Sequence, residues 1–173
     1  MKLLEKILVA IDVNTDSTEQ LNTTIKLPEA YTSEIILMHV VGDMELKDNI
    51  KDIVVKSVTD SLNAIKDVLI GNKVKVREPE VVFGKIVETI VQKANSERVN
   101  LTLIGSNKKK KRKKIKLGVI SEQIIQESDV PVWSVNAEKK HCFPAYFARS
   151  IFQNHQNGHL PMPLKLQGNL MPN

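Results

Sequence analysis

Cysteine, aromatic residues, glycine and proline are all scarce in this sequence. The 173 residues include one cysteine, seven glycines and seven prolines, and Phe, Trp and Tyr make up 4% of the chain. A single cysteine excludes an intramolecular disulfide and leaves no second thiolate for a metal cage. The low glycine and proline content argues against collagen, a disordered chain or a β-propeller. The sequence therefore predicts a folded protein without disulfide or thiolate–metal chemistry.

Long hydrophobic runs are also missing. No apolar run approaches the roughly 20 residues that a membrane-spanning helix needs. Residues 1–6 lead directly into a strand pattern instead of the apolar centre of a signal peptide. We therefore expect a cytoplasmic protein without membrane contact. The length suits one α/β domain with about thirty residues to spare, and is too short for two such domains.

Positive charge is concentrated in one segment, from Lys108 to Lys116. It contains eight Lys or Arg and no acidic residue, and subtracting these eight from the net charge of +5 leaves −3 for the rest of the chain. Three interpretations stay open: a solvated loop without a ligand, a clamp for a phosphate or nucleotide, or non-specific contact with nucleic acid. No aromatic residue is interleaved with the lysines, so base stacking is not indicated.

Two kinds of apolar pattern alternate along the chain. Short continuous runs predict buried strands, and apolar residues spaced three or four apart predict amphipathic helices. The expected strands cover residues 6–12, 34–41, 74–83, 101–104 and 130–135. Pro79 interrupts the third of them and places it at the sheet edge. The expected helices are a short one of about three turns after residues 14–18, and others over 45–69, 86–94 and 119–128. This alternation predicts parallel strands, right-handed crossovers and helices on both faces of the sheet.

The character of the chain changes after residue 137. The last 33 residues, 141–173, hold four of the seven prolines and three of the four histidines, without sustained periodicity. We expect a domain over 1–137 and a tail over 138–173. Apolar residues between Phe143 and Phe152 fit either a short docking helix or a disordered segment. The tail histidines and Cys142 match no metal-ligand spacing.

Several segments together resemble the universal stress protein family over about residues 2–136. They are Lys6 to Asp12, Leu37 to Val41, Gly84 to Val91, Leu101 to Ser106, Gly118 to Ile125, and Val130 to Val135. The resemblance implies a Rossmann-like fold, similar to adenine nucleotide alpha hydrolases, with an open five-stranded parallel sheet of order 3-2-1-4-5. It also implies dimers that pair through the fifth strand, between Val130 and Val135. In one branch of the family an adenine nucleotide binds at the switch point between strands one and four.

The nucleotide-binding branch of that family has the pattern Gly-x2-Gly-x9-Gly-Ser/Thr. This sequence keeps the spacing with Gly105, Lys108, Gly118 and Val119, so the second glycine and the final hydroxyl are replaced. Glycines let backbone N–H groups approach phosphate oxygens, and a hydroxyl adds a hydrogen bond. The resemblance implies a site for ATP with Mg²⁺ in which Lys108 and its neighbours supply charge. Its residues are Asp12, Val40, Gly105, Lys108, Gly118, Val119 and Ile120.

Ordinary structural roles compete with several of these assignments. Asp12 either contacts the nucleoside end of a ligand or caps the following turn and faces water. Val40 either presents its backbone to adenine or is a core valine, and His39 is better explained as a hydrogen-bonded core histidine than as a general base. Trp133 is interpreted first as a core residue and second as part of a dimer interface.

Four functional hypotheses remain open from the sequence. The first is a regulatory, ligand-binding protein of the universal stress type. The second is a family member that binds no nucleotide and acts through dimer and partner contacts. The third is a weak ATP hydrolase and the fourth a non-specific nucleic-acid binder. No Ser-His-Asp, paired-carboxylate or Cys-His arrangement can be assembled, so we predict no catalytic residues.

Overall fold

The computed structural model describes residues 4–43, 47–105 and 118–135. Strands and helices alternate along these residues, as the sequence pattern predicts. The elements in chain order are β1 (Lys6–Ala10), α1 (Thr18–Tyr31), β2 (Glu34–Val41), α2 (Asp48–Gly71), β3 (Lys75–Val76), β4 (Glu80–Phe83), α3 (Ile86–Ser96), β5 (Leu101–Gly105), α4 (Val119–Glu127) and β6 (Val132–Val135). The segments 108–116 and 138–173, singled out above, lie outside the described residues.

All described strand pairs are parallel, and the order is β3-β2-β1-β5-β6, with β4 also pairing with β2. The predicted order is confirmed when β3 and β4 count as one strand. The predicted interruption of this third strand at Pro79 is confirmed, because β3 ends at Val76 and β4 begins at Glu80. Ile35 pairs with Val76 and Met38 with Glu80, so this edge strand has one more residue than β2 over the same stretch. Pro79, which lacks an N–H group, lies in that bulge-like break.

The first helix is longer than predicted. It has 14 residues, or about four turns, where the sequence indicated three. Pro28 lies inside it near its C-terminal end. A proline there removes one helical hydrogen bond without ending the helix.

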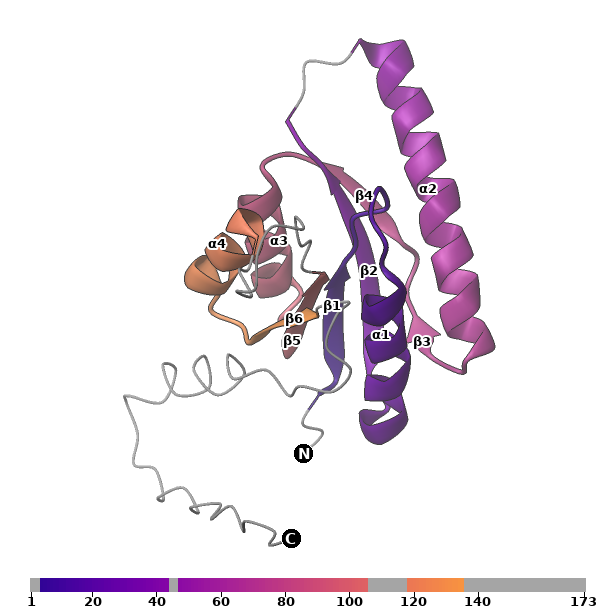
Figure 1. Ribbon diagram of the computed structural model, residues 1–173, viewed down its shortest axis with the longest axis vertical. Helices are drawn as coiled ribbons and strands as arrows, with labels where there is room; N and C mark the ends of the chain where they lie inside the picture. The colour runs from indigo at the N-terminus through magenta and orange to yellow at the C-terminus, as the bar shows by residue number, and fades with distance from the viewer. Residues whose placement is uncertain (1–3, 44–46, 106–117, 136–173) are drawn as a thin grey trace, which may run out of the picture.

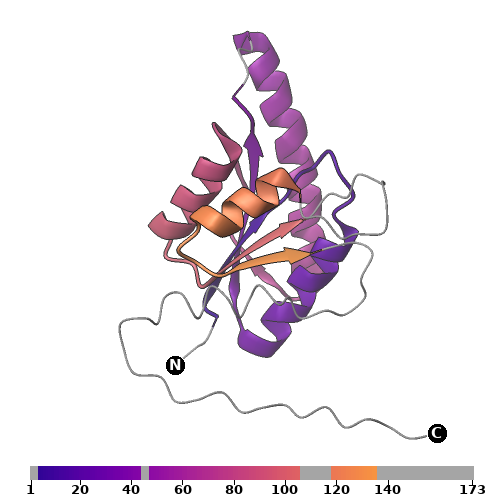
Figure 2. The ribbon, with the colours of Figure 1, turned by 60° about the vertical axis from the view of Figure 1, so that its left-hand side comes forward.

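Helices cover both faces of the sheet, α1 and α2 on one side and α3 and α4 on the other (Figures 1 and 2). Successive side chains of a strand point to opposite faces, so each strand contributes to two cores. In β1, Ile7 and Val9 pack with the α1 and α2 side, whereas Leu8 packs with the α3 and α4 side. These residues are fully buried. The long apolar runs seen in the sequence are thus explained by burial on both faces.

One buried hydroxyl has no hydrogen-bond partner among the described residues. Thr102 of β5 is 1% exposed, and its Oγ1 is unpaired. Replacing Thr102 with valine is expected to raise the free energy of unfolding by about 1 kcal/mol, because the desolvated hydroxyl is removed at nearly constant volume. Urea unfolding monitored by circular dichroism measures the change. Thr24→Val is the matched control: Thr24 is equally buried, but its Oγ1 donates to the Gln20 carbonyl oxygen at 2.8 Å, so this change should not stabilise.

Ion pairs gather at the amino edge of the sheet. Glu34, at the start of β2, accepts from Lys75 and from Arg77 Nε, each at 2.9 Å. Glu97, just after α3, accepts from Arg77 Nη1 at 2.8 Å and from Lys93 at 3.3 Å. Hydrogen bonds from Arg77 and then Lys93 lower the pKa of Glu97 below the ordinary glutamate value. The network joins β2, the break after β3, and the end of α3.

Acid is expected to weaken this network. Because the pKa of Glu97 is lower in the folded than in the unfolded protein, its stabilisation is complete above the ordinary glutamate pKa. That stabilisation is lost as the pH falls through and below that value. Between neutral pH and about pH 3, the free energy of unfolding of Glu97→Gln should therefore fall by about 1 kcal/mol less than that of wild type. Urea unfolding across this pH range is the measurement. Asp60→Asn, at an exposed carboxylate of α2 that has no hydrogen bond or ion pair among the described residues, should follow the wild-type profile.

No helix among the described residues is long and apolar enough to cross a membrane.

Candidate functional site

Three of the sequence-predicted site residues meet at the carboxyl edge of the sheet. Ala10, the last residue of β1, is in register with Met38 of β2 and Ile104 of β5. The Ile11 N–H continues the pairing to the Met38 carbonyl oxygen at 2.9 Å. Asp12, Val40 and Gly105 follow these positions, so all three lie at one edge. This is the switch point of an open parallel sheet, where neighbouring strands send their connections to opposite faces and ligands commonly bind.

Asp12 shapes the turn that leaves β1. Its Oδ1 accepts hydrogen bonds from the backbone and side-chain nitrogens of Asn14, at 3.0 and 3.2 Å. Its carbonyl oxygen accepts from the N–H and Oγ1 of Thr15, at 3.2 and 3.1 Å. The residue is exposed, and its Oδ2 has no hydrogen-bond partner among the described residues. Asp12 thus has a structural role in the turn and still offers one carboxylate oxygen at the sheet edge.

The side chains of Val40 and His39 belong to the interior. Val40 is 8% exposed and packs with the α3 and α4 side of the sheet. His39 Nδ1 lies 2.7 Å from the Ile11 carbonyl oxygen, and it must be the donor because a carbonyl only accepts. His39 is therefore the hydrogen-bonded core histidine that the sequence favoured. For Val40, the backbone and not the side chain is placed to meet a ligand at the edge.

Gly105 lies against a residue that sequence reasoning missed. Gln20, in the first turn of α1, is 4% exposed. Its Nε2 donates to the carbonyl oxygens of Ala10 and Leu103, at 2.9 and 3.3 Å. A Cβ at Gly105 would lie 3.0 Å from Gln20 Oε1. Packing against Gln20 is thus one reason for glycine here, independent of any phosphate.

The remaining predicted residues lie at the start of α4. Gly118 is the N-cap of α4, and because glycine has no side chain it makes no capping hydrogen bond to the N–H groups of the first turn. Val119 and Ile120 follow with 72% and 45% of their surfaces exposed. The N-terminus of a helix without such a cap offers free N–H groups and a partial positive charge to an anion. Lys108 lies outside the described residues.

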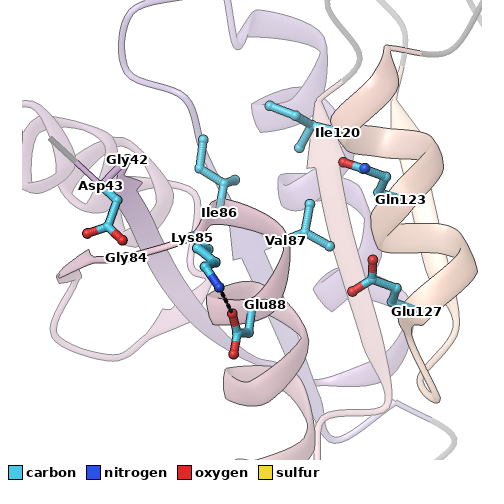
Figure 3. A pocket seen from close by; sticks show the side chains of 10 residues that line it. All are labelled: Gly42, Asp43, Gly84, Lys85, Ile86, Val87, Glu88, Ile120, Gln123 and Glu127. Carbon is cyan, nitrogen blue, oxygen red and sulfur yellow. Dashed lines mark ion pairs between the residues drawn. The ribbon is translucent and has the colours of Figure 1, made fainter.

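A groove of about 560 Å³ opens between α3 and α4, beyond the carboxyl ends of β2 and β4 (Figure 3). Ile86 and Val87 of α3 and Ile120 of α4 give it an apolar centre. An ion pair between Lys85 and Glu88, 3.5 Å apart, lies along one side. The described residues that line it are Gly42, Asp43, Gly84, Lys85, Ile86, Val87, Glu88, Ile120, Gln123 and Glu127.

Among the described residues, Ile120 is the one predicted site residue in the groove lining, so the structure does not bring Asp12, Val40 or Gly105 into this groove. The sequence feature that could have indicated the groove is the pair of glycines that follow its neighbouring strands, Gly42 after β2 and Gly84 after β4. Gly84 has φ of +149°, a value that side chains disfavour, and its N–H donates to the Val41 carbonyl oxygen at 3.1 Å. This geometry turns the chain sharply from β4 into α3.

No group of three or more His, Cys, Asp or Glu side chains among the described residues could hold a metal ion. Asp43, Glu88 and Glu127 border the groove without forming such a group. Any Mg²⁺ at this edge would need ligands from elsewhere, such as the oxygens of a bound phosphate.

A parallel sheet with helices on both faces defines the class of open, doubly wound α/β proteins. Comparison with known proteins gives the particular family. Residues 4–136 match the Universal stress protein family. This chain belongs to that family. Universal stress protein MJ0577 from Methanocaldococcus jannaschii is 30% identical over 148 residues, which cover 68% of this chain and 88% of that protein.

Solved structures agree with this assignment. The structure of MJ0577 has a TM-score of 0.63 at 28% identity, covering 80% of this chain and 99% of that one. A universal stress protein from Archaeoglobus fulgidus in complex with dAMP has a TM-score of 0.59 at 18% identity, covering 76% and 98%. A universal stress protein in complex with cAMP has a TM-score of 0.58 at 16% identity, covering 76% and 96%. At such low identity the last two establish the fold alone.

Proposed function

We propose that this chain is a regulatory, ligand-binding protein that takes an adenine nucleotide at the carboxyl edge of its sheet. The observation that carries the proposal is the convergence of Asp12, Val40 and Gly105 at the switch point, set by strand register. Two relatives of the same fold were solved with dAMP and with cAMP, which supports this ligand class. The proposal includes a cytoplasmic homodimer that pairs through the strand between Val130 and Val135.

Each part of the edge suits a different part of a nucleotide. The Oδ2 of Asp12, which has no hydrogen-bond partner among the described residues, can accept a hydrogen bond from a ribose hydroxyl. The backbone of Val40 can form a hydrogen bond with an adenine edge. The N-terminus of α4, capped by Gly118 without a side-chain bond, favours phosphate. Lys108 and the lysines after it would add charge, and ATP could bring Mg²⁺ through its own oxygens.

A second candidate is a family member that binds no nucleotide and acts through dimer and partner contacts. Two observations favour it. The close approach of Gln20 Oε1 explains a glycine at position 105 without any ligand. The exposed Val119 lies where the nucleotide-binding branch has a hydroxyl. A weak ATP hydrolase and a nucleic-acid binder centred on Lys108 to Lys116 remain less specific possibilities.

Mass spectrometry of small molecules released from the purified protein tests the proposal directly. Retained ATP or AMP, together with a thermal shift on adding millimolar ATP and Mg²⁺, is the expected result. Absence of both would remove the nucleotide hypothesis and leave the second candidate. A thermal shift with random DNA that vanishes at high salt would instead indicate polyanion binding through the basic segment.

Asp12→Asn is expected to weaken AMP binding about fivefold, because a charged acceptor becomes a neutral one. The asparagine Oδ1 can still accept from Asn14, so the turn should persist. Isothermal titration calorimetry gives the affinities. Asp60→Asn, at an exposed position of α2 away from the edge, is the control and should bind AMP like wild type. Equal affinity of both variants would show that Asp12 makes no contact with the ligand.

A further inference from the structure

Gln20 occupies the interior of the switch point although glutamine is usually a surface residue. It is 4% exposed at the third position of α1, directly beneath the carboxyl ends of β1 and β5. Thr24, one turn later in α1, is fully buried, but its Oγ1 donates to the backbone carbonyl oxygen of Gln20, at 2.8 Å, and not to the Gln20 carboxamide. The position of the carboxamide is therefore set by its own contacts with the strand ends.

The hydrogen bonds of Gln20 fix the orientation of its carboxamide. Nε2 has two protons, and the carbonyl oxygens of Ala10 and Leu103 accept from it at 2.9 and 3.3 Å. Carbonyl oxygens cannot donate, so the reverse orientation would place Oε1 against two acceptors. Oε1 must then face Gly105, where a Cβ would be only 3.0 Å away. Because the amide is held at its other end, Oε1 cannot easily retreat from that Cβ.

These contacts span the last pair of residues between the two strands. Ala10 and Ile104 are the final register pair of β1 with β5, and Leu103 immediately precedes Ile104. Beyond this pair the chain leaves β1 toward α1, while β5 continues one residue further to Gly105. No further strand pairing between β1 and β5 follows among the described residues, so Gln20 joins the two strands at the point where their pairing ends.

We propose that Gln20 is a positioning residue that fastens the ends of β1 and β5 together and disfavours any side chain at position 105. It sets the spacing between the Asp12 turn and the Gly105 end of β5. The role of Gln20 in joining the two strands rests only on its hydrogen bonds to Ala10 and Leu103 and its distance from Gly105. Its importance for a ligand rests on the proposed function, because a nucleotide at this edge would have to meet both strand ends at once.

A double-mutant cycle tests the link between the two residues. Gly105→Ala should lower the thermal midpoint of wild type by several degrees, but lower that of the Gln20→Ala variant by less than half as much. The alanine methyl can then enter the space that the glutamine leaves. Equal losses in both backgrounds would overturn the claim that Gln20 disfavours a side chain at position 105.

Amide hydrogen exchange tests the fastening. Gln20→Met keeps the length of the side chain and removes both hydrogen bonds. Exchange at the Asn14, Thr15 and Gly105 amides should accelerate about tenfold, whereas the core amides of Leu37 and Leu62 should change little. A uniform acceleration, or none, would overturn the proposal, since a general loss of stability affects all amides together.

AMP affinity tests the positioning role. We expect Gln20→Met to bind AMP about tenfold more weakly than wild type, and Thr24→Val, which perturbs the same helix without touching the strand ends, to bind like wild type. Equal affinity of Gln20→Met and wild type would overturn the positioning role. If wild type itself binds neither AMP nor ATP, the proposed function fails, and the exchange and double-mutant results still decide the fastening.

Discussion

Replacing Leu103 with alanine is expected to lower the free energy of unfolding by about 3 kcal/mol. Leu103 is fully buried in β5, in register with Val9 on one side and Trp133 on the other. It belongs to the core between the sheet and the helices α1 and α2. Alanine would remove the apolar contacts and leave a cavity that strands on both sides prevent from closing.

Urea unfolding monitored by circular dichroism measures the effect of Leu103→Ala. Ile53→Ala is the control, because Ile53 of α2 is 67% exposed and its truncation should cost about 0.5 kcal/mol or less. Similar losses in the two variants would contradict the two-layer core described above. The change is large compared with the total stability of a typical domain, about 5–15 kcal/mol, so Leu103 has much more influence on folding than the residues of the edge site.

The sheet could be predicted because strands buried on both faces leave a simple signal. The runs around Leu8 and Ile36 are continuously apolar, and the run around Leu103 is interrupted only by Thr102. Such runs are typical of strands buried on both faces. The break between β3 and β4 was predicted in part, since Pro79 interrupts the apolar pattern there. Pro79 marked an edge strand, but the extra residue opposite β2 depends on register, which the sequence pattern does not determine.

The site was predicted only in part, for reasons that lie in the packing. The alternation of strands and helices predicts parallel strands, and the carboxyl ends of parallel strands place Asp12 and Gly105 at one edge. Gln20 could not be foreseen, because a polar residue in the first turn of a helix normally faces water and is buried here by the strand ends above it. The groove depends on how α3 lies beside α4, and local pattern carries no information about that.

The two candidate functions differ most clearly at the start of α4. A nucleotide-binding site needs donors for phosphate there, and the backbone N–H groups of the first turn supply some of them. The side chain of Val119 supplies none, and 72% of its surface is exposed to water. An exposed valine at the first position of a helix contributes little to the core. Its replacement therefore changes the chemistry of the edge with little effect on folding.

Val119→Ser is expected to tighten ATP binding about tenfold, because the serine hydroxyl adds a hydrogen bond to a charged phosphate oxygen. Isothermal titration calorimetry with ATP and Mg²⁺ at fixed ionic strength measures the affinity, since phosphate contacts weaken as salt screens them. Val119→Ala is the matched control. It also removes the apolar branch but adds no hydroxyl, so its affinity should stay within about twofold of wild type.

The comparison of Val119→Ser with Val119→Ala separates the possible explanations. A gain in the serine variant alone places the phosphate of a bound nucleotide at the N-terminus of α4. Equal gains in both variants would mean that valine blocks the site by its size, so the missing hydroxyl would not be the cause of weak binding. If no variant binds ATP, restoring one donor is insufficient, and the chain acts as the family member without a nucleotide, through contacts made by other surfaces.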